Sequence, residues 1–160
     1  MPSDSMKKVK ILVVYHSQTG NTQKMAEKVA QGAGAIENVE VVLKRAQEAT
    51  LDDLIACSGL AIGSPENFGY MSGMVKDFFD RTYEQARKRK EVFKKPYVVF
   101  ISAGNDGTGA LQHIERICLG YPFKKVYEPV IAKGQITEEV LEKCKELGQI
   151  IAAGCEAGIY

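Results

Sequence analysis

A run of small polar residues directly after an apolar segment is the part of this chain best suited to chemistry. The apolar segment, 9–15, is rich in β-branched residues and predicts a strand buried on both faces. The polar run opens a helical pattern and consists of Ser17, Gln18, Thr19, Gly20, Asn21 and Thr22. Free N–H groups at a helix start attract anions, hydroxyls and amides add donors, and Gly20 lets the backbone approach closely. The run therefore predicts a phosphate-binding turn.

The composition of this turn limits the phosphate compounds it could bind. It has neither the Gly-x-x-x-x-Gly-Lys-[Ser/Thr] pattern of nucleoside triphosphate sites nor the Gly-x-Gly-x-x-Gly pattern of dinucleotide sites. A single terminal phosphate is the better match. The alternative interpretation is an ordinary helix start, since Ser, Thr and Asn are common N-cap residues.

Two further polar loops follow apolar runs at 59–63 and 97–101. The second loop contains Ser64, Pro65, Glu66, Asn67, Phe68, Gly69, Tyr70 and Met71. The third loop is rich in glycine and contains Ala103, Gly104, Asn105, Asp106 and Gly107, before Thr108 and Gly109. A flat heteroaromatic ring needs an apolar or aromatic face and backbone donors around its edge, which these loops offer. We therefore expect a phosphorylated aromatic cofactor.

The elements that must position the three loops alternate between strand and helix. Apolar runs predict strands at 9–15, 39–43, 59–63, 97–101 and 126–132. Helical spacing of apolar residues predicts helices at 20–33, 51–56, 74–82, 111–118 and 140–151. We expect the helix at 74–82 to run on into the charged stretch at 87–90. This alternation predicts an α/β fold with a doubly wound parallel sheet covered on both faces. All three loops then lie at the carboxyl edge of the sheet, where such folds bind ligands.

Length and composition fit one globular domain, which we expect at 8–160 after a flexible tail at 1–7. The chain has 160 residues, is 45% hydrophobic and carries a formal net charge of +1, which argues against nucleic-acid binding. Its four cysteines form no Cys-x-x-Cys, so we expect reduced thiols, no metal site and a cytoplasmic location. No segment approaches the length of a membrane span.

The loops resemble those of the flavodoxin-like superfamily, and the resemblance extends from Lys8 to the last helix. The run 17–22 looks like the FMN phosphate loop of that family. The segment 63–72, followed by 74–82, is similar to the isoalloxazine loop of flavodoxin-like NAD(P)H:quinone reductases and related FMN reductases. The resemblance implies a five-stranded sheet in the order 2-1-3-4-5, with FMN across the ends of strands one, three and four. It assigns cofactor binding to 17–22, 64–71 and 103–107, and no catalytic residue, because FMN carries the chemistry.

The chain departs from parts of the family pattern. Electron-shuttle flavodoxins usually have an acidic surface and an aromatic residue in the third loop, whereas this chain is near neutral and 103–109 contains no aromatic. One face of the ring should therefore be open to a stacked hydride donor or acceptor. The quinone-reductase branch often has a histidine in the third loop and an inserted segment that supports tetramers, and neither is evident here.

Several side chains near the loops have two interpretations. Phe68 either packs beside the flavin or fills the loop. Glu66 and Asp106 either tune the flavin potential or are solvated, and His16 either contacts the cofactor or is structural. We expect His113 at the surface. A basic patch is either a solvated helix end or a site for a protein partner or an NADP phosphate, and it contains Arg81, Arg87, Lys88, Arg89, Lys90, Lys94 and Lys95.

These observations predict an FMN-dependent oxidoreductase that passes electrons from NAD(P)H to a quinone or similar acceptor. The partner would be a small redox substrate. The sequence leaves open whether the chain forms a homo-oligomer. The alternative is a one-electron carrier between redox proteins, with the basic patch as its docking site. A third possibility is a flavin-free interaction module that keeps the fold, although the intact phosphate turn argues against it.

Overall fold

A computed structural model describes residues 8–160, so the tail predicted at 1–7 lies outside the described residues. The strands are β1 (Val9–Tyr15), β2 (Val39–Arg45), β3 (Gly59–Pro65), β4 (Pro96–Ala103), β5 (Lys124–Lys125) and β6 (Val130–Lys133). The helices are α1 (Asn21–Gly34), α2 (Leu51–Ala56), α3 (Gly73–Ala86), the short 3-10 helix η2 (Lys90–Val92), α4 (Thr108–Gly120) and α5 (Glu138–Ala157). All strand pairs are parallel, in the order β2-β1-β3-β4-β5 with β6 also beside β4.

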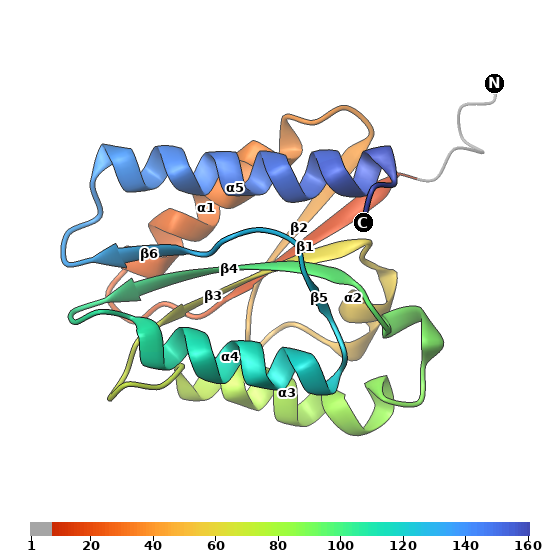
Figure 1. Ribbon diagram of the computed structural model, residues 1–160, viewed down its shortest axis with the longest axis horizontal. Coiled ribbons are helices and arrows are strands. Elements are labelled where there is room, and N and C mark those ends of the chain that lie inside the picture. The colour runs from red at the N-terminus through yellow and green to blue at the C-terminus, as the bar shows by residue number, and fades with distance from the viewer. Residues whose placement is uncertain (1–7) are drawn as a thin grey trace.

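Helices cover both faces of this sheet (Figure 1). Successive side chains of a strand point to opposite faces, so β1 contributes to two separate cores. Ile11 and Val13 pack with α1 and α5, whereas Leu12 and Val14 pack with α2, α3 and α4. The predicted doubly wound α/β fold with strand order 2-1-3-4-5 is confirmed.

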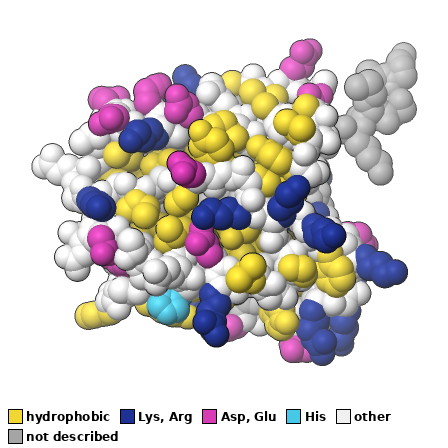
Figure 2. Space-filling view, viewed as in Figure 1, with side chains coloured by type: hydrophobic (Ala, Val, Ile, Leu, Met, Phe, Trp, Pro, Cys, Tyr) yellow, Lys and Arg dark blue, Asp and Glu magenta, His cyan; other side chains and the backbone are white. Residues whose placement is uncertain are grey.

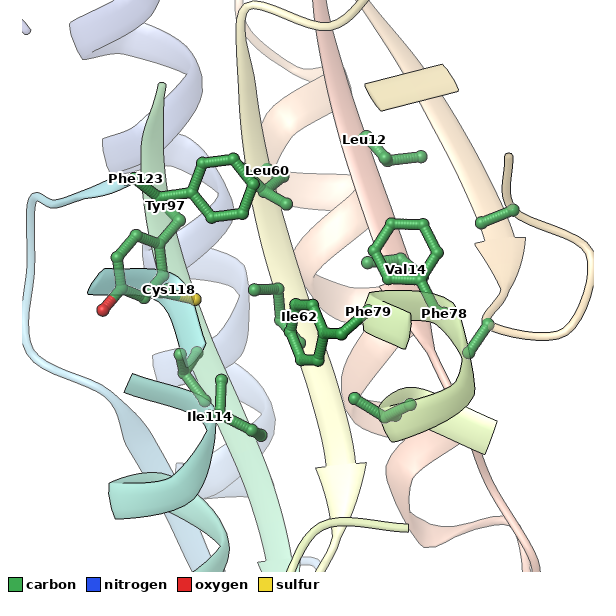
Figure 3. Close-up of a cluster of buried hydrophobic side chains, with 14 of the residues drawn as sticks. Leu12, Val14, Leu60, Ile62, Phe78, Phe79, Tyr97, Ile114, Cys118 and Phe123 are labelled. Atoms are coloured by element: carbon green, nitrogen blue, oxygen red, sulfur yellow. The ribbon is translucent and has the colours of Figure 1, made fainter. Parts of the chain in front are cut away.

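The core under α3 and α4 is rich in aromatic side chains. Figure 3 shows Phe78 and Phe79 reaching from α3 toward the strands that carry Val14 and Ile62. Aromatic rings bury a large apolar area each, so this layer holds α3 firmly on the sheet. The loop that precedes α3 is therefore attached to a rigid support.

Helices α1 and α5 contact each other through their backbones. A Cβ atom on Gly32 would lie 2.0 Å from the carbonyl oxygen of Lys145, and one on Gly148 would lie 2.0 Å from that of Val29. No side chain larger than hydrogen fits at either glycine, so this pair of helices has one close packing arrangement. The position of α1, and of the turn at its start, depends on α5.

The fifth strand differs from the prediction of a continuous run at 126–132. It is divided into β5, which pairs with the start of β4, and β6, which pairs with Phe100–Ala103. Pro129 lies between the two parts, and proline has no N–H group to donate to a ladder. Likewise, α3 ends at Ala86 instead of running on to 87–90, and η2 begins only at Lys90.

The cysteines are free thiols, and three of the four are buried. Burial raises the pKa of Cys57 and of Cys155 to about 11, and that of Cys144 to about 12. Within residues 8–160, no group of three or more His, Cys, Asp or Glu side chains could hold a metal ion. In the same range no helix combines the length and the hydropathy that crossing a membrane requires.

Candidate functional site

The three predicted loops meet at the carboxyl edge of the sheet. Tyr15 pairs with Gly63 and Pro65 pairs with Ser102, so β1, β3 and β4 end at one level. A cavity of about 720 Å³ lies at this edge. The predicted residues that line it are Gln18, Thr19, Asn21, Thr22, Pro65, Glu66, Asn67, Ala103 and Gly104.

The first loop leaves the start of α1 uncapped. Gly20 adopts the left-handed conformation at the N-cap with φ 101°, and no side chain caps the helix. The first helical bond runs from the Lys24 N–H to the Gly20 oxygen at 3.1 Å, so three N–H groups precede it. By contrast, side chains of Ser72 and Thr137 cap α3 and α5. A helix start left without a cap beside a cavity fits a phosphate group.

A buried pair of hydroxyls joins the first loop to β4. The Thr22 and Ser102 hydroxyl oxygens are 2.7 Å apart, and both side chains line the cavity. Two hydroxyls carry two protons, and the bond between them uses only one. The pair can therefore donate one further hydrogen bond into the cavity.

The second loop is a tight turn. The Asn67 N–H donates to the Tyr70 oxygen at 2.8 Å, and the Tyr70 N–H donates to the Asn67 oxygen at 2.9 Å. Phe68 and Gly69 between them have φ values of 54° and 73°, the signs that a type I′ turn requires. Phe68 is fully exposed at the tip, so its ring neither fills the loop nor lines the cavity.

Part of the second loop serves the fold rather than the cavity. The Ser64 hydroxyl is buried, donates to the Pro65 oxygen at 2.7 Å and accepts the Ser72 N–H at 2.9 Å. Met71 belongs to the core, and the Tyr70 ring packs against His113. Five predicted residues of this loop therefore do not line the cavity: Ser64, Phe68, Gly69, Tyr70 and Met71.

The first and third loops also contain supporting residues. Ser17 accepts the Gly20 N–H at 3.1 Å behind the turn. Asp106 accepts the N–H and the hydroxyl of Thr108 at 3.1 and 3.0 Å, bonds that lower the pKa of its carboxyl and begin α4. Neither Asn105 nor Gly107 lines the cavity. The three predicted loops thus meet at one cavity, but only some of their residues line it.

Other lining residues were missed by the sequence analysis. They are Lys24, Ser102, Gly134, Gln135 and Ile136. Lys24 lies in the first turn of α1, directly after the three residues whose N–H groups precede the first helical hydrogen bond. The turn 134–136 follows β6, and the edge it occupies could have been anticipated, because every parallel strand ends there.

His16 follows β1 but is not part of the cavity lining. Burial lowers its pKa, the charge of Arg45 acts in the same direction, and a hydrogen bond with Gln47 opposes both. His113 is exposed, as expected, and contacts the second loop.

The basic patch lies at the opposite end of the molecule from the cavity. Figure 2 shows Lys and Arg gathered at the lower right, over the end of α3 and the segment after it. With 14 residues, α3 is about 20 Å long and separates this end from the second loop. Arg81 donates to the Ala46 and Ala49 oxygens, and Lys95 to the Cys57 oxygen, so these two cations support the fold.

The sequence model of the flavodoxin family matches residues 13–148. The chain belongs to the flavodoxin family. A flavodoxin of Aquifex aeolicus is 38% identical over 159 residues, covering 89% of this chain and 85% of the relative. An archaeal flavodoxin structure superimposes with a TM-score of 0.79 at 27% identity and covers 92% of this chain and 99% of that one. The predicted resemblance to the flavodoxin-like superfamily is thus confirmed.

Other members of this superfamily are enzymes by name. A quinone oxidoreductase of Triphysaria versicolor is 30% identical over 120 residues. The match covers 62% of this chain and 58% of that relative, so the chain spans little more than half of the enzyme.

Proposed function

We propose that the cavity binds FMN, with its phosphate at the start of α1 and its ring beside the second and third loops. The uncapped helix start supports the phosphate position, because its N–H groups have no side-chain cap. Asn21, Thr22 and Lys24 line the cavity at that start and would add an amide, a hydroxyl and a charge. FMN supplies the redox chemistry when bound, whereas the residues of this chain bind and orient it.

We further propose that the protein transfers electrons from NAD(P)H through FMN to a quinone or similar acceptor. The observation that carries this proposal is the small size of the third loop at the cavity, where only Ala103 and Gly104 contribute. A ring beside them is left uncovered on that side, and hydride transfer needs such an open face for stacking. The free cysteines suit a reducing compartment, and we infer the cytoplasm.

The second candidate function is that of a one-electron carrier between redox proteins. The relation to the Aquifex aeolicus flavodoxin, which extends over most of both chains, favours it. A carrier needs only an exposed edge of the ring and no space for a stacked substrate. A redox partner of such a carrier would dock beside the cavity. It would not dock on the basic patch, because the length of α3 separates the patch from the cavity.

One experiment distinguishes the two functions. NADH or NADPH, added without oxygen to the FMN-loaded protein, should bleach the flavin absorbance directly, and a benzoquinone should then restore it. Gly104→Tyr is the matched variant, because a Cβ at Gly104 meets no atom within 4 Å and the new ring can cover the open face. We expect this variant to bind FMN and to lose the reaction with NAD(P)H.

The carrier function replaces the reductase function if neither nucleotide bleaches the flavin while dithionite or a reductase protein does so. Equal binding of FMN and riboflavin by the wild-type protein would contradict the position given to the phosphate.

A further inference from the structure

The second and third loops are joined by a carboxylate. The Gly107 N–H donates to Oε1 of Glu66 at 3.2 Å, and the Glu66 N–H donates to the Ser102 oxygen at 2.8 Å. Glu66 is thus attached to β4 through its backbone and to the start of α4 through its side chain. Its carboxylate links loops that are about 40 residues apart in sequence.

The Glu66 carboxylate accepts its hydrogen bond from a closely packed backbone position, Gly107. Gly107 is buried, has a φ of 75° and begins α4 as its N-cap. A Cβ there would lie 2.7 Å from the Ile131 side chain, so β6 closes the other side. Within residues 8–160, the Glu66 carboxylate forms no ion pair. Its carboxylate therefore accepts from a backbone N–H instead of pairing with a cation.

A second set of contacts joins the same two segments farther along. A Cβ on Gly109 would lie 2.1 Å from the Gly69 oxygen, so the two backbones touch. The Tyr70 and His113 ring centroids are 4.5 Å apart, and Nδ1 of His113 donates to the Gly109 oxygen at 2.6 Å. The turn at 67–70 is thus supported at its end, and Glu66 supports its beginning.

We propose that Glu66 is a positioning residue that fixes the third loop to the second before the cofactor ring binds. This inference rests on the proposed function and deepens it. Loops that are already ordered lose less conformational freedom on binding, so the link increases affinity for the ring. Within residues 8–160, Glu66 forms no hydrogen bond with the start of α1, so we expect it to contribute nothing to the recognition of the phosphate.

The two parts of the cofactor allow this role to be measured. FMN and riboflavin share the ring and differ in the phosphate, so their affinities for the apoprotein are compared in each variant. Glu66→Ala removes the acceptor, and Glu66→Gln keeps a neutral acceptor oxygen. Glu84→Ala, which removes an exposed carboxylate paired with Arg87 on α3, is the matched control.

We expect Glu66→Ala to lower the affinities for FMN and for riboflavin by the same factor, about tenfold or more. In Glu66→Gln both affinities should fall less. Hydrogen exchange of the Gly107 amide in the apoprotein should accelerate by a similar factor in Glu66→Ala. The control should change neither quantity.

The inference is wrong if Gly107 exchanges at the wild-type rate in Glu66→Ala, or if only FMN binding weakens. A loss of thermal stability with unchanged affinities would equally overturn it. If Glu66→Ala does not fold, Gly107 exchange and the two affinities in Glu66→Gln decide. Failure of the proposed function looks different, because wild-type protein would then not prefer FMN to riboflavin, and Gly107 exchange would still test the link.

Discussion

The hydroxyl pair of Thr22 and Ser102 makes an unusual double-mutant prediction. The two side chains are 1% and 6% exposed, so bulk water hardly reaches them, and their oxygens are 2.7 Å apart. Thr22→Val and Ser102→Ala each remove one hydroxyl with little change of shape. Each single variant leaves the other hydroxyl buried without its partner, whereas the double variant leaves none.

The free energy of unfolding should reflect this difference. A buried polar group without a partner costs about 1 to 3 kcal/mol, so each single variant of the apoprotein should lose about that amount. The double variant should be no less stable than the less stable of the two single variants. The coupling energy is then at least the smaller of the two single losses, about 1 to 3 kcal/mol.

Phosphate recognition should follow the opposite pattern. A single variant keeps one hydroxyl, whose proton is free to donate to the phosphate, so the preference for FMN over riboflavin should change little. The double variant has no such donor, and the preference should fall by about 10- to 100-fold, the equivalent of one charge-assisted hydrogen bond. Urea denaturation of the four apoproteins and titration with both ligands measure the two quantities. Additive losses of stability, or a preference already lost in Thr22→Val, would refute the reasoning.

Three further changes test other parts of the structure. Lys24→Gln should lower the affinity for FMN by about two- to fivefold at low salt and by less at high salt, and it should leave the affinity for riboflavin unchanged. A loss of FMN affinity that is independent of salt would contradict a charge interaction. Phe68→Asn should raise the free energy of unfolding by about 1 kcal/mol, since Asn tolerates the left-handed φ of 54° better than a bulky ring does; a lower melting temperature would show that the ring contributes contacts. Thiol labelling of the folded protein should be slow at pH 7 and rise with pH, because burial raises the pKa of Cys57 and Cys155 to about 11, and Cys155, the partly exposed one, should react first. Fast labelling of all four thiols without denaturant would contradict this burial.

The fold could be predicted because its signals are local and repeated. The apolar run 9–15 is recognisable as a buried strand from its own residues, and the helical spacing after Gly20 is equally clear. The division of the fifth strand could not be predicted in this way. It depends on which part of β4 each half reaches, and that is a tertiary property.

The meeting of the three loops at one cavity could be predicted from the sequence, whereas the side chains that line this cavity could not. Parallel strands bring their carboxyl ends together, so the meeting of the three loops follows from topology. The direction of Tyr70 and Met71 depends on the type I′ turn, which reverses the chain after Phe68, a residue that rarely adopts positive φ. Lys24 and the turn 134–136 were missed because neither matches a motif, although both lie at the edge that the topology identifies.

The backbone contact between α1 and α5 also has a consequence in time. Helix α1 is among the first elements to be synthesised, yet the face that carries Met25 and Val29 packs against residues of α5. Until 138–157 have emerged from the ribosome, that face packs only against the strands, and the close backbone contacts that fix the position of α1 are missing. We therefore expect a nascent chain stalled before residue 138 to retain no FMN, so that cofactor loading follows translation although the phosphate turn is made near its beginning.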